Sequence, residues 1–315
     1  MYKNKYTFSR AVGILACALL CSACTERQSP AAFTPHTLSP LETVRELAAS
    51  NSAMTGPRSS DISIYPQEIQ AILKRGEMVF AMTSMDQKPF FYTDEQTGLL
   101  IGLDVELAYE IANLLGVKAV FNREADSFDD VIMKVVNKEA DIALSKISRT
   151  MRRAEMVRYT IPYITFRQGL LINRLELAKI TSEKNLPGFI TNFRGRLGVI
   201  KNSSYASYAA TNFPNADLCL YDSWTETVDA LFKGEILAAY RDEGEILIVT
   251  TSKSDASILM KIVFLTDKQD PIAMAVSSDA PLLQEWLNLF LESYLIQHKE
   301  ELKTNKLVER HFDTI

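Results

Sequence analysis

The spacing of hydrophobic positions predicts alternating strands and helices from Ile62 onward. Short apolar runs bounded by polar or turn-forming residues predict strands, and apolar residues three or four apart predict helices. The expected strands are 78–83, 118–122, 141–145, 169–173, 197–201, 218–221, 236–241, 261–265 and 272–276. This alternation is typical of an α/β fold, in which helices cover mostly parallel sheets.

Start and stop signals define the helices between these strands. Asp104 is expected to cap a helix that ends before Gly116, with its apolar residues on one face. Further helices are expected to begin at Ser127, at Ser203 or Ser204, at Ser223 and at Pro281. Ligands of such folds bind beyond the carboxyl ends of the strands, so the residues that follow strands are the first candidates for a site.

The N-terminus resembles a bacterial lipoprotein leader. Basic residues precede an apolar stretch, 11–21, that is too short to span a membrane as a helix. It ends in C-S-A-C-T, which is similar to a lipobox. The resemblance implies that residues 1–23 are a signal peptide, that Cys24 is lipidated, and that the protein is anchored to a membrane through this lipid.

Residues 24–61 are rich in Ser, Thr, Pro and Ala and predict a flexible tether. A capping-box pattern at Ser39–Glu42 predicts a short helix within it. If Cys24 carries a lipid, Cys219 is a single thiol in an apolar run and is most simply buried in a core. The alternative is cleavage by ordinary signal peptidase, after which Cys24 and Cys219 could form a disulfide.

Composition and charge exclude several classes of function. The 315 residues carry a net charge of −5, and removing residues 1–23 discards three basic and no acidic residues, which leaves about −8. With a pI near 5.4 and no basic patch, a nucleic-acid partner is not expected. The three histidines are scattered and no Cys/His metal spacing exists, so we expect neither a metal nor a cofactor.

The segment 143–163 carries the strongest chemical signal. Ser148 and Thr150 follow an expected strand, and Thr150 can cap a helix that contains Arg153. Hydroxyl groups, free backbone N–H groups and a guanidinium would then converge, which predicts a receptor for a carboxylate. The alternative is that Arg153 is one of several surface arginines on a solvated helix.

Four segments in this order resemble the family 3 extracellular solute-binding proteins, the amino-acid receptors of bacterial ABC importers. They are K-P-F-F-Y-T-D-E-Q-T-G-L-L-I-G-L-D-V-E-L (88–107), S-F-D-D-V-I-M-K-V-V-N-K-E-A-D-I-A (127–143), S-R-T-M-R-R-A-E-M-V-R-Y-T-I-P-Y (148–163) and L-F-K-G-E-I-L-A-A-Y-R-D (231–242). The resemblance implies a type II clamshell of two α/β lobes joined by two hinge strands. Lobe 1 would be 62–171 plus 271–315, and lobe 2 would be 172–270.

The resemblance also implies roles for individual residues. Arg153 would grip the α-carboxylate of the ligand with help from Ser148, and Phe128 would pack on the ligand. Asp242 would bind the α-ammonium. Ser203 and Ser204 would complete the carboxylate site from lobe 2. The alternatives are that Asp242 only caps a helix and that Phe128 is only a core residue.

Two departures from the family pattern concern the ligand's side chain. Gln87 replaces a stacking aromatic residue, and Lys146 replaces a small residue. If both face the ligand, they favour a polar or acidic side chain, or a second carboxylate. The alternative is that Lys146 turns away and pairs with a surface acid.

The expected function is that of a monomeric, lipid-anchored receptor in the periplasm or cell envelope, which delivers an amino acid or related carboxylate to an ABC permease. Such a receptor catalyses no reaction. Two alternatives stay open on the same fold. One is a periplasmic enzyme of the cyclohexadienyl dehydratase type, which needs an acid or base in the cleft. The other is a sensory module that reports to a separate partner.

Overall fold

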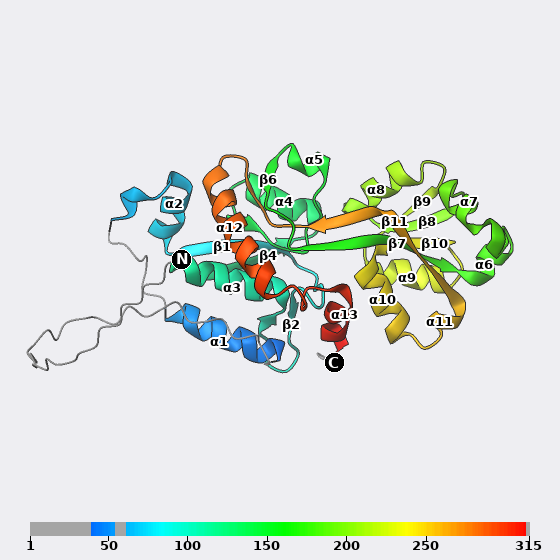
Figure 1. Cartoon of the computed structure of the whole chain (residues 1–315), viewed down its shortest axis with the longest axis horizontal. Helices are drawn as coiled ribbons and strands as arrows, with labels where there is room; N and C mark the ends of the chain where they lie inside the picture. The colour runs from blue at the N-terminus through cyan, green and yellow to red at the C-terminus, as the bar shows by residue number, and fades with distance from the viewer. Residues whose placement is uncertain (1–38, 54–60, 313–315) are drawn as a thin grey trace, which may run out of the picture. The chain divides into compact units, whose positions relative to one another are not determined.

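The computed structural model describes residues 39–53 and 61–312, so the predicted leader and Cys24 lie outside the described residues (Figure 1). Within them the strands form two five-stranded sheets and one two-stranded sheet, β2 (Tyr92–Thr93) with β3 (Leu100–Ile101). Helices alternate with the strands along the chain. The predicted α/β class is therefore confirmed.

The first five-stranded sheet has the order β4-β1-β5-β12-β6. Its strands are β1 (Glu77–Thr83), β4 (Lys118–Ala125), β5 (Ile142–Ala143), β6 (Val157–Tyr159) and β12 (Ala275–Ser277). β1 is parallel to β4 and β5, whereas β12 is antiparallel to β5 and β6. The helices that precede or follow these strands are η1 (Ile62–Ile64), α2 (Gln67–Arg75), α3 (Leu103–Leu115), α4 (Phe128–Val136), α5 (Met151–Ala154), α12 (Pro281–Gln297) and α13 (Thr304–Phe312).

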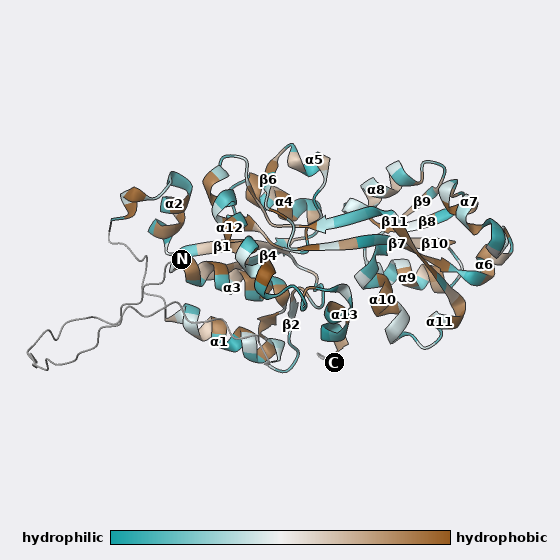
Figure 2. Cartoon of the chain, viewed as in Figure 1, coloured by the Kyte–Doolittle hydropathy of each residue, from teal (hydrophilic) through white to brown (hydrophobic). Residues whose placement is uncertain are grey.

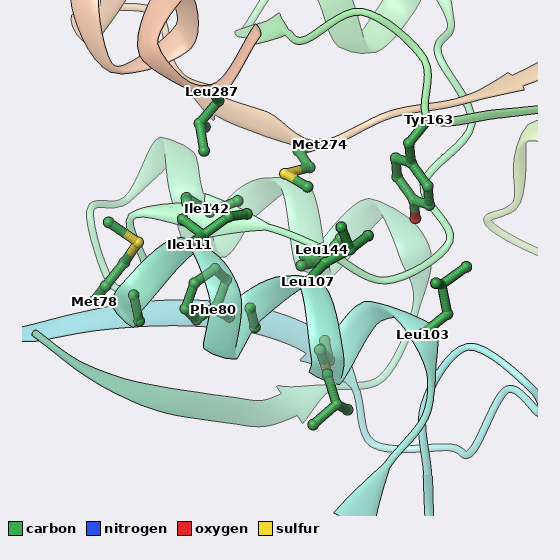
Figure 3. Close-up of a cluster of buried hydrophobic side chains, with 14 of the residues drawn as sticks. Met78, Phe80, Leu103, Leu107, Ile111, Ile142, Leu144, Tyr163, Met274 and Leu287 are labelled. Atoms are coloured by element: carbon green, nitrogen blue, oxygen red, sulfur yellow. The ribbon is translucent and has the colours of Figure 1, made fainter. Parts of the chain in front are cut away.

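The largest core cluster lies between this sheet and its helices. Figure 3 shows Phe80 and Ile142 of the strands facing Leu107 and Ile111 of α3, with Leu287 of α12 above them. All five side chains are fully buried. Figure 2 shows hydrophilic and hydrophobic residues interspersed along the helices, as expected for helices with one buried and one solvated face.

The predicted N-cap of α3 is wrong. Gly102 precedes the helix with φ 124°, and a Cβ there would lie 2.5 Å from the carbonyl oxygen of Phe90. Asp104 lies in the first turn and is fully buried. Its carboxylate accepts hydrogen bonds from the Lys146 amide (2.8 Å) and the Tyr163 hydroxyl (2.8 Å), so it organises the chain around Lys146 and does not cap its own helix.

The second five-stranded sheet has the order β11-β7-β10-β8-β9. Its strands are β7 (Ile164–Asn173), β8 (Arg196–Ile200), β9 (Asp217–Tyr221), β10 (Ala238–Asp242) and β11 (Met260–Ile272). β10, β8 and β9 are parallel, whereas β7 is antiparallel to β10 and β11. The helices of this part of the chain are α6 (Arg174–Ala178), η2 (Glu183–Asn185), α7 (Leu186–Thr191), α8 (Ser204–Asn212), α9 (Trp224–Phe232), α10 (Glu243–Ser252) and α11 (Ala256–Leu259).

The chain crosses between the two sheets on β7 and β11, which lie side by side (Figure 1). The hydrophobic pattern predicts two separate strands here, 261–265 and 272–276. β11 instead runs without a break through Pro271, with an irregular register between Leu265 and Gln269. β11 is an edge strand, where a proline costs no ladder hydrogen bond, and this explains the difference. Leu170 and Leu171 already pack in the cores of the second sheet, a little before the boundary expected at 171.

Helix α1 (Pro40–Ser52) lies in the segment predicted to be a flexible tether. Its capping box at Ser39 and Glu42 is present as predicted. The helix packs against α3, and the Asn51 side chain donates to Asn113 Oδ1 and to the Val117 carbonyl, both at 2.8 Å. Residues 39–53 are therefore part of the folded body, because Asn51 satisfies backbone groups that a tether would leave to water.

Cys219 is only half-buried, since it lies on the edge strand β9, so the expectation of a core thiol is wrong. Cys24, its partner in the alternative disulfide, lies outside the described residues. None of the helices within residues 39–53 and 61–312 is long and apolar enough to cross a membrane.

Candidate functional site

Six of the eight predicted ligand-binding residues line one cavity at the carboxyl ends of strands from both sheets. The cavity is lined by Phe128, Lys146, Ser148, Arg153, Ser204, Tyr205, Arg241, Asp242, Asp270 and Ile272. Its volume is about 10 Å³, which is roughly the room for one water molecule. The side chains of the site are thus drawn together, and a ligand has to part them to enter.

Arg153 is buried. Burial is compatible with a ligand-binding role, and it rules out the alternative of a surface arginine on a solvated helix. Thr150 caps α5, and its hydroxyl accepts from the Arg153 amide. The guanidinium Nε donates to Asp129 Oδ1 (2.9 Å) and Nη1 donates to the Ser148 carbonyl (3.3 Å). Nη2 lies 2.8 Å from the same Asp129 oxygen without the geometry of a hydrogen bond.

The helix that carries Arg153 is short. α5 ends at Ala154 after one turn, so its dipole adds little to the attraction of an anion. The guanidinium is therefore the main positive charge that this segment offers to an anion. Asp129, its partner, was not predicted as a site residue, although it directly follows Phe128 in the first turn of α4.

Lys146 reaches across to the second sheet. Its Nζ lies 3.1 Å from Asp242 Oδ2 and 2.8 Å from Glu245 Oε1. Burial opposes its charge, but the two carboxylates outweigh burial and raise its pKa above the ordinary value. Lys146 therefore pairs with the acid that was predicted to bind an ammonium group, and the alternative of a surface acid is wrong.

Asp242 has two structural roles in this arrangement. As the N-cap of α10, it accepts from the Glu245 amide through Oδ1 (3.1 Å), which confirms the capping interpretation. Its Oδ2 faces Lys146, and Arg241 Nε lies 3.6 Å away. Burial favours the neutral carboxyl, but the two cations prevail and hold the pKa of Asp242 below its usual range.

Arg241 is a cation of the cavity that was not among the predicted site residues. Its side chain is 4% exposed, and its Nε has no hydrogen-bond partner among the described residues. Its Cζ lies 5.8 Å from the ring centroid of Phe128, 5.7 Å from that of Tyr205 and 6.0 Å from that of Trp224. Three aromatic rings thus surround a guanidinium that faces the cavity.

Hydroxyl groups and one further acid complete the lining. The Ser204 hydroxyl donates to Ser148 Oγ across the two sheets (2.9 Å). Asp270 lies near the end of β11, a position that motif analysis alone did not connect to the site. Burial, and then the charge of Asp242, raise the pKa of Asp270 to about 6. A hydrogen bond with the Ser148 hydroxyl lowers this pKa and so opposes part of the rise.

Two predicted residues lie outside this cavity. Ser203 caps α8: its hydroxyl donates to the Ile200 carbonyl (2.6 Å) and accepts from the Ala206 amide. Gln87 lines a neighbouring cavity of about 470 Å³, whose wall also includes Phe128, Trp224 and Glu245. Gln87 therefore faces a space beside the charged cluster and does not face the cluster itself.

Among residues 39–53 and 61–312, no group of His, Cys, Asp or Glu side chains has the arrangement of a metal site. The chemistry available in the cavity is that of charge and hydrogen bonding: three cations, the acids Asp242 and Asp270, and hydroxyl groups. Such a cluster suits a small polar ligand.

Comparison with known proteins gives a family match over most of the chain. The sequence pattern of the bacterial extracellular solute-binding proteins, family 3, matches residues 79–314. An amino acid ABC transporter substrate-binding protein from Streptococcus pneumoniae, solved with L-arginine bound, is similar with a TM-score of 0.62. The two are 25% identical, and the likeness covers 78% of this chain and 98% of that one. The predicted two-lobe fold is thereby confirmed.

Two curated relatives are similar over shorter stretches. A cyclohexadienyl dehydratase from Pseudomonas aeruginosa is 31% identical over 106 residues, which is 34% of this chain and 38% of the relative. An arginine-binding periplasmic protein from Mannheimia haemolytica is 23% identical over 155 residues, 49% of this chain and 59% of the relative. The matched stretches thus span less than two thirds of either relative.

Proposed function

Because the chain belongs to family 3 of the bacterial extracellular solute-binding proteins, we propose that it captures a small carboxylate between its two lobes and delivers it to an ABC permease. Membership of this family implies a location outside the cytoplasm. The observation that carries the proposal is the convergence of Arg153 and Ser148 from the first lobe with Ser204 and Arg241 from the second on one cavity.

In this proposal Arg153 anchors the carboxylate of the ligand. Its backbone and guanidinium are fixed by Thr150, Ser148 and Asp129, so the side chain loses little freedom when a ligand binds. The hydroxyl of Ser204 supplies a further donor from the other lobe. Phe128 lines both the charged cavity and the neighbouring space of about 470 Å³, which can take the remainder of a larger ligand once the lobes part.

Ligand binding is tested by a thermal-shift screen of small carboxylates, followed by titration of each compound that raises the melting temperature. Mass action predicts a stabilisation of about 2.7 kcal/mol at a hundredfold excess over Kd. Replacing Arg153 with Gln should abolish the shift, whereas replacing the exposed Arg158 with Gln should leave it unchanged. A shift that survives Arg153→Gln would contradict the proposed anchor.

The similarity to a cyclohexadienyl dehydratase supports a second candidate, an enzyme on the same fold. Asp270 is the cavity group whose pKa, raised to about 6, best suits proton exchange near neutrality. The two candidates differ in one measurement. An enzyme converts a cyclohexadienyl acid steadily, and Asp270→Asn stops the conversion, whereas a receptor returns every bound compound unchanged.

A further inference from the structure

Asp242, the acid that was predicted to bind an ammonium group, is already occupied by donors of the protein itself. Asp242 has Lys146 Nζ at 3.1 Å and the Glu245 amide at 3.1 Å. Asp270 is less closely approached, since the Tyr208 hydroxyl lies 3.5 Å from its Oδ1 and 3.1 Å from the Arg149 carbonyl oxygen. An ammonium group of a ligand would therefore have to displace a donor before it could bind Asp242.

The hydrogen-bonding group that lacks a partner in the cavity is a cationic donor and not an acid. Arg241 is more than nine-tenths buried, and its Nε donates to no described residue. The carboxylate oxygen nearest to this guanidinium in an ion pair belongs to Asp242, at 3.6 Å, beyond hydrogen-bond distance. A buried cationic donor without an acceptor is costly, so a ligand that supplies an acceptor oxygen to Arg241 gains affinity.

Lys146 stands where an amino group would otherwise bind. Its backbone lies in the left-handed region (φ 49°) in the turn after β5. In this conformation its amide donates a hydrogen bond to the Asp104 carboxylate. Its Nζ also lies 5.1 Å from the ring centroid of Phe90 and 5.5 Å from that of Phe166. Two carboxylates and two aromatic rings thus hold the lysine ammonium in place.

We propose that Lys146 takes the place of the ligand's ammonium on Asp242, and that the site accordingly selects small carboxylates that carry a second acceptor oxygen and no amino group. This inference rests on the proposed function. Arg153 binds the carboxylate and Arg241 binds the second acceptor, which can be a keto oxygen or another carboxylate.

The site disfavours an amino acid, because its ammonium group would have to take the place of the Lys146 ammonium on Asp242. Its ammonium would replace one ammonium on Asp242 by another, which gains little, and would leave the buried Lys146 with Glu245 as its remaining acid beside the guanidinium of Arg241. A 2-oxo acid of the same skeleton leaves the pair of Lys146 and Asp242 intact and satisfies Arg241. The difference between the two ligands is a single functional group, which makes the inference testable without knowing the natural ligand.

The test is calorimetric titration of the full chain, after unfolding and refolding to remove bound compounds, with matched pairs: pyruvate and L-alanine, 2-oxoglutarate and L-glutamate, phenylpyruvate and L-phenylalanine. At least one oxo acid should bind, at least tenfold more tightly than its amino partner. Arg241→Met should weaken binding of that oxo acid at least tenfold. Lys146→Ser should invert the preference, because Asp242 then becomes free for an ammonium.

Lys138→Ser is the matched control, since Lys138 also has a left-handed backbone (φ 62°) but pairs with Asp279 at the surface. It should leave the preference unchanged. Tighter binding of an amino acid than of its oxo partner by the wild type overturns the inference and leaves the proposed function standing. Failure of all six compounds to bind also overturns the inference, and counts against the proposed function if the wider carboxylate screen finds nothing either. The wild-type comparison decides even if a variant does not fold.

Discussion

The ammonium of Lys146 and the carboxylate of Asp242 lie 3.1 Å apart, although one follows a strand of the first sheet and the other ends a strand of the second. Both side chains are less than 5% exposed. The pair therefore joins the two lobes inside the cleft, at the point where a ligand is expected to do so.

Removing this lysine should destabilise the closed protein. Lys146→Met removes the closest cation of both Asp242 and Glu245, and breaking a buried pair in this way typically costs ~3–5 kcal/mol. Denaturant unfolding measures the loss. Lys138 has the same left-handed backbone conformation as Lys146 but forms its ion pair at the surface. Lys138→Met should therefore cost less than ~1 kcal/mol. Equal, small losses in both variants would show that Lys146 does not hold the lobes together.

Asp104 should make stability depend on pH. Burial raises the pKa of its carboxyl to about 7, against hydrogen bonds from the Lys146 amide and Tyr163 that lower it. A carboxyl with a folded-state pKa above its unfolded value of about 4 stabilises the protein while protonated, and that contribution is lost as pH rises through about 7. In melting experiments between pH 5 and pH 8, Asp104→Asn should therefore gain stability relative to wild type as pH rises. A constant difference would contradict the shifted pKa.

Asn51 should hold α1 on the folded body. Its side chain donates to the Val117 carbonyl and accepts from the Ala119 amide, both at 2.8 Å. Asn51→Ala leaves both backbone groups without partners, at a cost of ~1–3 kcal/mol each. We expect a lower melting temperature and faster proteolytic cleavage before residue 61. Ser50→Ala, an exposed change on the same helix, should alter neither, and the same result for both variants would refute the docking role.

The lipid anchor is the prediction that depends on the N-terminus. If Cys24 is acylated, Cys24→Ser should move the protein from the membrane fraction to the soluble fraction after cell lysis. Cys219→Ser should leave the distribution unchanged. Persistence of the Cys24→Ser variant in the membrane fraction would count against the lipobox interpretation.

Much of the site was predictable because it depends on short motifs. Ser127, Ser203 and Ser223 cap helices as local sequence predicts, since the capping side chain and the amide it accepts from lie three residues apart. Strand ends in such folds converge, which is why Ser148 and Ser204 meet although neither motif refers to the other.

The partnerships between the motifs were not predictable. Whether Lys146 faced a ligand or an acid depended on how far the two sheets lie apart, and no local pattern reports that distance. Arg241 was not predicted as a site residue, because its burial among aromatic rings depends on packing between α4, α8 and α9. Asp270 lies between the two strands predicted at 261–265 and 272–276. It lines the cavity because β11 instead continues through Pro271.

The most direct test of the account is the identity of the compound that the protein carries when it is purified from its native host. Mass spectrometry after denaturation should find one small carboxylate, near one molecule per protein chain, in wild type and in Arg158→Gln. The Arg153→Gln variant, purified in parallel, should release none. A released compound without a carboxylate, or equal retention by Arg153→Gln, would contradict a receptor in which Arg153 anchors the ligand.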